Sequence, residues 1–132
     1  MCGIMGCIGE RARTRVVAGL KLLEYRGYDS AGVSFSKGGR VVTVKKKGRI
    51  AELERALKTA EDDSRFAIGH TRWATHGRAC VRNAHPFVSR DRSFALVHNG
   101  IIENHRALRA MLEREGLSLI HISEPTRLQL IS

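Results

Sequence analysis

Met1-Cys2-Gly3-Ile4 opens the chain, and the rest of the sequence is organised around this stretch. Because a small side chain follows Met1, we expect an aminopeptidase to remove Met1 and leave Cys2 as the first residue. Cys2 then carries a thiol beside a free α-amine, a group whose reference pKa is about 7.7–8.0. Such an amine can accept a proton from a nearby nucleophile at neutral pH. A cysteine at this position can equally be a small buried hydrophobe, so the remainder of the chain must decide.

The bulk composition is that of an ordinary globular protein. The chain has 132 residues, 42% of them hydrophobic and 27% charged, enough for one domain with a modest core. No apolar run approaches the roughly 18 residues of a membrane span. The first residues also lack the basic-then-apolar order of a signal peptide. We therefore expect a cytoplasmic protein with no membrane partner.

The cysteines and the charge exclude several kinds of site. Three cysteines are an odd number, which argues against a disulfide framework. Cys2 and Cys7 lack the usual zinc-binding spacing, and although nearby histidines could join Cys80, we expect no metal and no cofactor. The net charge is +10, but the basic residues are scattered and aromatic residues are only 5%. We therefore expect no nucleic-acid partner.

Hydrophobic periodicity predicts an α+β protein in which helices pack on an antiparallel sheet. Strands are predicted at 2–9, 31–36, 40–47, from 66 onward and at 93–98. Helices are predicted at 13–25, 50–60 and 103–115. The glycines at 38 and 39 predict a hairpin turn, and those at 27 and 116 predict helix C-caps. The polar stretch 70–92 is expected to be irregular.

Four stretches carry polar residue types that a core does not need. They are residues 2–3, 25–32, 70–77 with 83–86, and 98–104. Acyl transfer by a thiolate needs oxyanion donors, which Asn99 and Gly100 can supply, and a clamp for a carboxylate, which Arg72 can form in bidentate fashion. It also needs a loop that excludes water, and residues 72–80 with Trp73 suit that task.

Each of these features has a plainer structural interpretation. Asn99-Gly100 is common in turns, and Asp29 can close a turn. Arg72 can form a surface ion pair, and Trp73 can be a core residue. Only their order and spacing, taken together, point to one function.

Taken together, the motifs resemble the glutaminase domain of the glutamine–fructose-6-phosphate aminotransferase (isomerising) family. The carrying residues are CGI at 2–4, LEYRGYDSAG at 23–32, GHTRWATHG at 69–77, NAHPF at 83–87 and VHNGIIENH at 97–105. The resemblance covers residues 1–116, a truncated glutaminase domain. It implies an N-terminal-nucleophile hydrolase fold, a four-layer αββα sandwich that is incomplete here.

The resemblance also implies the roles of individual residues. Cys2 attacks the side-chain amide of L-glutamine, its α-amine handles the proton, and a γ-glutamyl thioester forms as ammonia leaves. Asn99 and Gly100 correspond to the oxyanion hole, and Arg72 to the clamp on the α-carboxylate. Further residues belong to the closing loop, lie near the glutamine or support the site: Trp73, Thr75, His76, His85 and Arg26.

The family uses the ammonia in an isomerase domain that this chain lacks. There fructose 6-phosphate becomes glucosamine 6-phosphate, and we expect the full-length protein to be a homodimer. The alternative is a phosphoribosyl-pyrophosphate amidotransferase. Its typical motifs are HRGQESAG and GHVRYSTxG, whereas the corresponding stretches of this chain read YRGYDSAG and GHTRWATHG.

Residues 117–132 depart from the family. They lack its Thr-Asp-Thr-Glu motif, whose aspartate holds the α-ammonium of glutamine, and Glu124-Pro125 changes the local backbone. We expect a non-native tail, with a native edge strand as the alternative. We expect the chain itself to be poorly active. The alternative is that it is a catalytically inert basic fragment.

Overall fold

The computed structural model describes residues 2–74 and 79–116. The described chain forms two compact units, residues 2–74 with 79–97 and residues 98–116. In the first unit the elements are β1 (Gly3–Ile8), α1 (Ala12–Leu22), η1 (Glu24–Arg26), β2 (Ser30–Lys37), β3 (Arg40–Lys47), α2 (Ile50–Leu57), β4 (Phe66–Arg72), η2 (Val81–Asn83), β5 (Phe87–Val88) and β6 (Ala95–Leu96). The second unit contains α3 (His105–Arg114).

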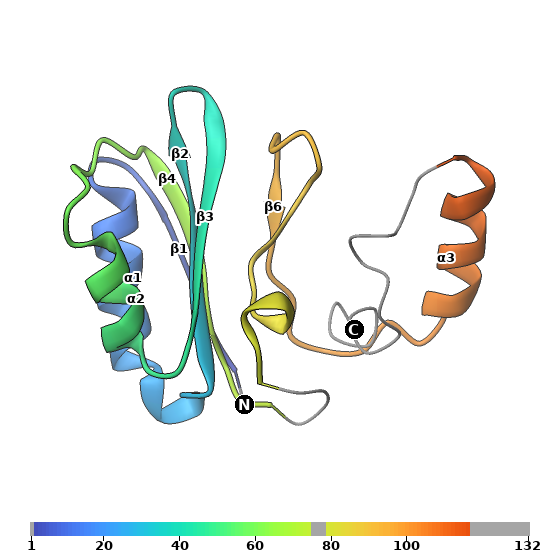
Figure 1. The fold of residues 1–132 in the computed structure, drawn as a ribbon, viewed down its shortest axis with the longest axis horizontal. Coiled ribbons are helices and arrows are strands. Elements are labelled where there is room, and N and C mark those ends of the chain that lie inside the picture. The colour runs from blue at the N-terminus through green and yellow to red at the C-terminus, as the bar shows by residue number, and fades with distance from the viewer. Residues whose placement is uncertain (1, 75–78, 117–132) are drawn as a thin grey trace. The chain divides into compact units, whose positions relative to one another are not determined.

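Four strands form one antiparallel sheet in the order β1-β4-β2-β3. β2 and β3 are joined by the predicted hairpin turn, in which Gly38 and Gly39 have φ angles of 56° and 73°. Positive φ at both central residues matches the twist of a two-residue hairpin, which explains the two glycines. Helices α1 and α2 lie together on one face of this sheet (Figure 1).

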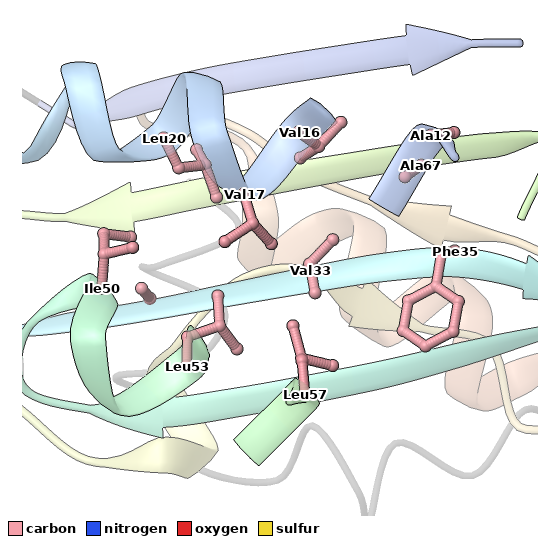
Figure 2. Close-up of a cluster of buried hydrophobic side chains, with 11 residues drawn as sticks. Ala12, Val16, Val17, Leu20, Val33, Phe35, Ile50, Leu53, Leu57 and Ala67 are labelled. Atoms are coloured by element: carbon pink, nitrogen blue, oxygen red, sulfur yellow. The ribbon is translucent and has the colours of Figure 1, made fainter. Parts of the chain in front are cut away.

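The core fills the space between these helices and the sheet. On β2, alternate residues point toward the helices, where Leu20 of α1 and Leu53 of α2 are completely buried (Figure 2). The buried apolar cluster consists of Ala12, Val16, Val17, Leu20, Ala31, Val33, Phe35, Ile50, Leu53, Leu57 and Ala67. Each large aliphatic side chain buried in this way contributes roughly 1.5–3 kcal/mol relative to an exposed one.

The opposite face of the sheet carries the segment that leads into the second sheet. A Cβ at Gly32 would lie 2.2 Å from the carbonyl oxygen of His85, so the two backbones touch. The ammonium of Lys45 donates to the carbonyl of Ala84 at 2.7 Å. β5 and β6 then pair antiparallel, Phe87 with Leu96. In Figure 1 they lie on the side of the sheet away from α1 and α2.

Two sequence predictions about strands are wrong in part. Residues 70–72 belong to β4 although their polarity indicated an irregular stretch, because they are buried between β1 and β2. The predicted strand at 93–98 is paired only at residues 95–96. Ser93 and Phe94 instead donate their N–H groups to the hydroxyl of Ser89, which closes the turn between β5 and β6.

Candidate functional site

Cys2 lies just before β1, and its half-buried sulfur contacts the main chain that follows β4. The backbone N–H of Trp73 donates to the Cys2 Sγ at 3.3 Å. The thiol lies 3.7 Å from the carbonyl oxygen of the same residue. These two contacts fix the Cys2 sulfur against the main chain of residue 73, and a nucleophile needs such a fixed position to meet its substrate in one direction.

Strand pairing fixes the position of Cys2. The β1–β4 register sets Gly3 opposite Thr71, and the Gly3 N–H donates to the Thr71 hydroxyl at 3.1 Å. A Cβ at Gly3 would lie 2.7 Å from that hydroxyl and 2.8 Å from the Cβ of Leu23. Only glycine therefore fits beside Cys2, and this close approach brings the sulfur to residue 73.

Arg72 is the last residue of β4 and is only 3% exposed. It lies in register with Ser30, the first residue of β2, so it sits at the end of an inner strand of the sheet. This burial excludes the surface ion-pair interpretation. A buried guanidinium next in the chain to the residue that contacts Cys2 fits a clamp for a carboxylate, a contact that stays a prediction.

Trp73 is 44% exposed, which excludes the core interpretation. Its ring meets that of Tyr28 edge to face, with the centroids 5.5 Å apart. The side chain thus lies on the surface while its backbone contacts Cys2. Thr75 and His76, which were predicted to lie near the glutamine, fall outside the described residues.

His85 and Arg26 both make contacts with neighbouring rings. His85 is buried and stacks on His70 at 4.4 Å between centroids, with Phe87 edge-on at 4.6 Å. Arg26 donates from Nε to the Tyr25 hydroxyl at 3.2 Å. These contacts support the β4 face and the η1 turn respectively, and a direct contact of His85 with glutamine stays a prediction.

Asn99 and Gly100 belong to the second unit, where both are exposed. Gly100 has a φ of 142°, a backbone conformation that favours glycine. Their role as oxyanion donors stays a prediction. Within residues 2–74 and 79–116, no cluster of His, Cys, Asp or Glu could hold a metal ion. None of the described helices is long and apolar enough to cross a membrane.

Sequence reasoning missed two residues around Cys2. Gly27 is the C-cap of η1, as predicted for a helix end, but its φ of −177° is extended, and it is small because the backbone of Arg72 passes over it. The side chain of Asp29 accepts a hydrogen bond from the N–H of Ala74. Neither contact follows from local sequence, because each joins segments that are more than 40 positions apart.

The sequence and the fold of this chain are both similar to those of known proteins. The family model of the class-II glutamine amidotransferases matches residues 19–115. The chain belongs to the class-II glutamine amidotransferases. A curated member of this family, the glutamine–fructose-6-phosphate aminotransferase (isomerising) of Symbiobacterium thermophilum, is 56% identical over 117 residues, 88% of this chain. The enzyme of the same name from Aquifex aeolicus is 49% identical over 118 residues, 89% of this chain.

The amidotransferase fold is also seen in a solved structure, that of the glutamine phosphoribosylpyrophosphate amidotransferase from B. subtilis complexed with ADP and GMP. It is 28% identical, with a TM-score of 0.75 over 97% of this chain and 28% of that chain. The predicted N-terminal-nucleophile fold is thereby confirmed. The chain spans about a fifth of the length of the curated relatives it matches, 19% and 20% for the two named above.

Proposed function

We propose that this chain is the glutamine-hydrolysing part of a glutamine–fructose-6-phosphate aminotransferase. The observation that carries the proposal is the contact of Cys2 Sγ with the Trp73 N–H, next to the buried Arg72. The sulfur attacks the side-chain amide carbon of glutamine. As the C–N bond breaks, ammonia leaves with the proton that the thiol gave up. Water then cleaves the γ-glutamyl thioester, which releases glutamate and restores the thiol.

The chain's own residues divide the remaining tasks. Once Met1 is removed, the α-amine of Cys2 accepts the thiol proton and passes it to the leaving nitrogen. Arg72 binds the α-carboxylate of glutamine through two parallel hydrogen bonds. Asn99 and Gly100 stabilise the oxyanion of the tetrahedral intermediate. Thr75 and His76 lie in the loop that closes over the substrate.

The whole protein would pass the ammonia to an isomerase domain, where fructose 6-phosphate becomes glucosamine 6-phosphate. We propose that the whole protein acts in amino-sugar biosynthesis in the cytoplasm, as a homodimer. The 56% identity to an enzyme of that name supports this proposal over the phosphoribosyl-pyrophosphate alternative, for which the likeness is 28%. The full-length protein should consume fructose 6-phosphate with ammonia, and consumption of phosphoribosyl pyrophosphate instead would favour the alternative.

The role of Cys2 is tested in the full-length protein with Cys2→Ala. The variant should lose glutamine hydrolysis by at least about a thousandfold, because no nucleophile remains, and should keep synthesis from free ammonia. Cys7→Ala is the matched control, since Cys7 is a half-buried thiol on β1 outside the site. Glutamate release at the wild-type rate by Cys2→Ala would refute the assignment.

A further inference from the structure

The main chain at residues 72–74 is what contacts the sulfur of Cys2, and a turn before β2 supports it. At Gly27 a Cβ would lie 2.4 Å from the carbonyl carbon of Arg72 and 2.7 Å from the nitrogen of Trp73. The two backbones are therefore in direct contact. A side chain at position 27 would displace the peptide whose N–H points at the sulfur.

Asp29 holds the same segment on both sides of Trp73. Its backbone N–H donates to the carbonyl of Arg72 at 3.2 Å. Its carboxylate Oδ2 accepts the N–H of Ala74. Together these hydrogen bonds fix the peptide groups before and after Trp73, so they also fix the direction of the Trp73 N–H.

Asp29 is itself fixed by its neighbours. The hydroxyl of Ser30, which is completely buried, donates to Oδ1 of Asp29 at 3.0 Å. The backbone carbonyl of Asp29 accepts the N–H of Gly48 at 2.8 Å. The carboxylate therefore has one oxygen anchored to β2 and the other available to the Ala74 N–H. A hydrogen bond to an ionised oxygen is stronger than one between neutral groups.

We propose that Asp29 is a positioning residue for the nucleophile. It acts through residues 72–74, keeping the Trp73 N–H 3.3 Å from the Cys2 Sγ and holding Arg72 at the end of β4. Its consequence for catalysis rests on the proposed function, since the sulfur that it positions is the one that attacks glutamine. The geometry itself can be tested without glutamine.

The test is the rate at which iodoacetamide alkylates Cys2, measured for each cysteine by mass spectrometry. Cys7 in the same molecule is the internal reference, because loosening of the whole fold would expose it and raise its rate. Asp29→Ala should lower the Cys2-to-Cys7 ratio about fivefold, the factor that corresponds to one net hydrogen bond. Asp29→Asn should stay within about twofold of wild type, since its side-chain oxygen can still accept the Ala74 N–H.

The control variant is Asp63→Ala, which removes an exposed carboxylate elsewhere in the chain and should leave the ratio unchanged. An unchanged ratio in Asp29→Ala, or an equal loss in Asp29→Asn, would overturn the proposal. If Asp29→Ala does not fold by circular dichroism, amide exchange of the wild-type chain decides. The Ala74 amide should exchange at least about tenfold more slowly than in an unstructured peptide, and an unprotected amide would overturn the proposal.

The alkylation experiment and the glutamine-hydrolysis assay test the positioning role and the proposed function independently. A full-length protein that does not hydrolyse glutamine, yet shows the fivefold effect of Asp29→Ala on Cys2, would refute the proposed function and leave the positioning role intact. Conversely, a Cys2-dependent glutaminase whose alkylation ratio is insensitive to Asp29 would keep the function and refute the positioning role.

Discussion

Single residues decide how closely the chain can approach itself around Cys2. Gly3 and Gly27 leave space that the Thr71 hydroxyl and the Arg72 backbone occupy. Because packed interiors yield little, an added methyl group at either position must move backbone or side-chain atoms. The position of the Cys2 sulfur therefore depends on the absence of a side chain at Gly3 and Gly27 as well as on the groups that contact it.

Gly3→Ala should destabilise the fold and displace Cys2. The new methyl group would lie 2.7 Å from the Thr71 hydroxyl, and we expect a loss of about 1–3 kcal/mol in the free energy of unfolding. Urea titration followed by circular dichroism measures this loss. Gly6→Ala on the same strand is the control, because its methyl group would have no neighbour closer than 3.9 Å. Equal stability of the two variants would contradict the packing argument.

The site was only partly predictable at this scale. Cys2, Arg72 and Trp73 could be proposed because their residue types suit thiol chemistry and their motifs resemble a family. Asp29 could be read only as a turn residue, because its bond to Ala74 joins positions 45 apart. Local rules describe what a residue does to its neighbours in sequence, whereas this contact depends on strand pairing.

Among the elements, α1 is notable because another segment caps it. Its N-cap residue, Arg11, has a φ of 53° and makes no side-chain cap. The first N–H groups of a helix lack internal partners. Here the backbone N–H of Ala12 donates to the carbonyl of Ser64, and that of Arg13 donates to the Ser64 hydroxyl. The N–H of Thr14 donates to the carboxylate of Asp62 at 2.8 Å. The segment before β4 therefore completes the helix that packs on β4.

Asp62→Ala should destabilise the chain, and should do so in a pH-dependent way. Burial acts to raise the pKa of Asp62, but hydrogen bonds from Ser64 and Thr14 outweigh it and lower the pKa to about 2. Since the folded pKa lies below the unfolded value, the stabilisation is complete above about pH 4 and disappears as the pH falls toward 2. Urea titrations at neutral and acid pH should show about 2 kcal/mol lost at neutral pH.

The same experiment on Asp63→Ala supplies the control. Asp63 is the exposed neighbour of Asp62, so its removal should change the unfolding free energy by less than about 0.5 kcal/mol. At pH 2.5 the wild type and Asp62→Ala should approach each other. A constant difference between them from pH 7 to pH 2.5 would show that the carboxylate's charge is not what caps the helix.

Elements were predictable where their signals were local. The hairpin at Gly38 and Gly39 follows from turn chemistry, and α2 begins at Ile50 as its periodicity predicts. β4 was cut short in the prediction because its last three residues are polar yet buried. Periodicity distinguishes apolar from polar positions, and it fails where a sheet buries polar groups for a site.

At the scale of the whole molecule, one face of the sheet is only partly covered. Ile8 is 91% exposed and lies in register with Phe66, which is 45% exposed, and Ile4 on the same side of β1 is 44% exposed. Exposed apolar side chains of this kind favour association with other apolar surfaces. We therefore expect this face of the sheet to promote association between copies of the chain.

Ile8→Lys should reduce self-association of the purified chain, seen by light scattering and by lower binding of an apolar dye. The midpoint of unfolding should stay unchanged, because the replaced side chain is exposed. Val33→Lys is the contrast, since Val33 is completely buried and a charge there should unfold the chain. Unchanged scattering by Ile8→Lys would indicate that this face is not what brings copies together.

The pairing of β1 with β4 has a consequence for biosynthesis. Gly3 and Thr71 are 68 positions apart, and contacts of such long range form late because the intervening loop must first be closed. As the nascent chain leaves the ribosome, β1 cannot pair with β4 until residue 72 has been translated. The expected removal of Met1 therefore has an interval in which to occur, and Cys2 docks against residue 73 once β4 has paired with β1.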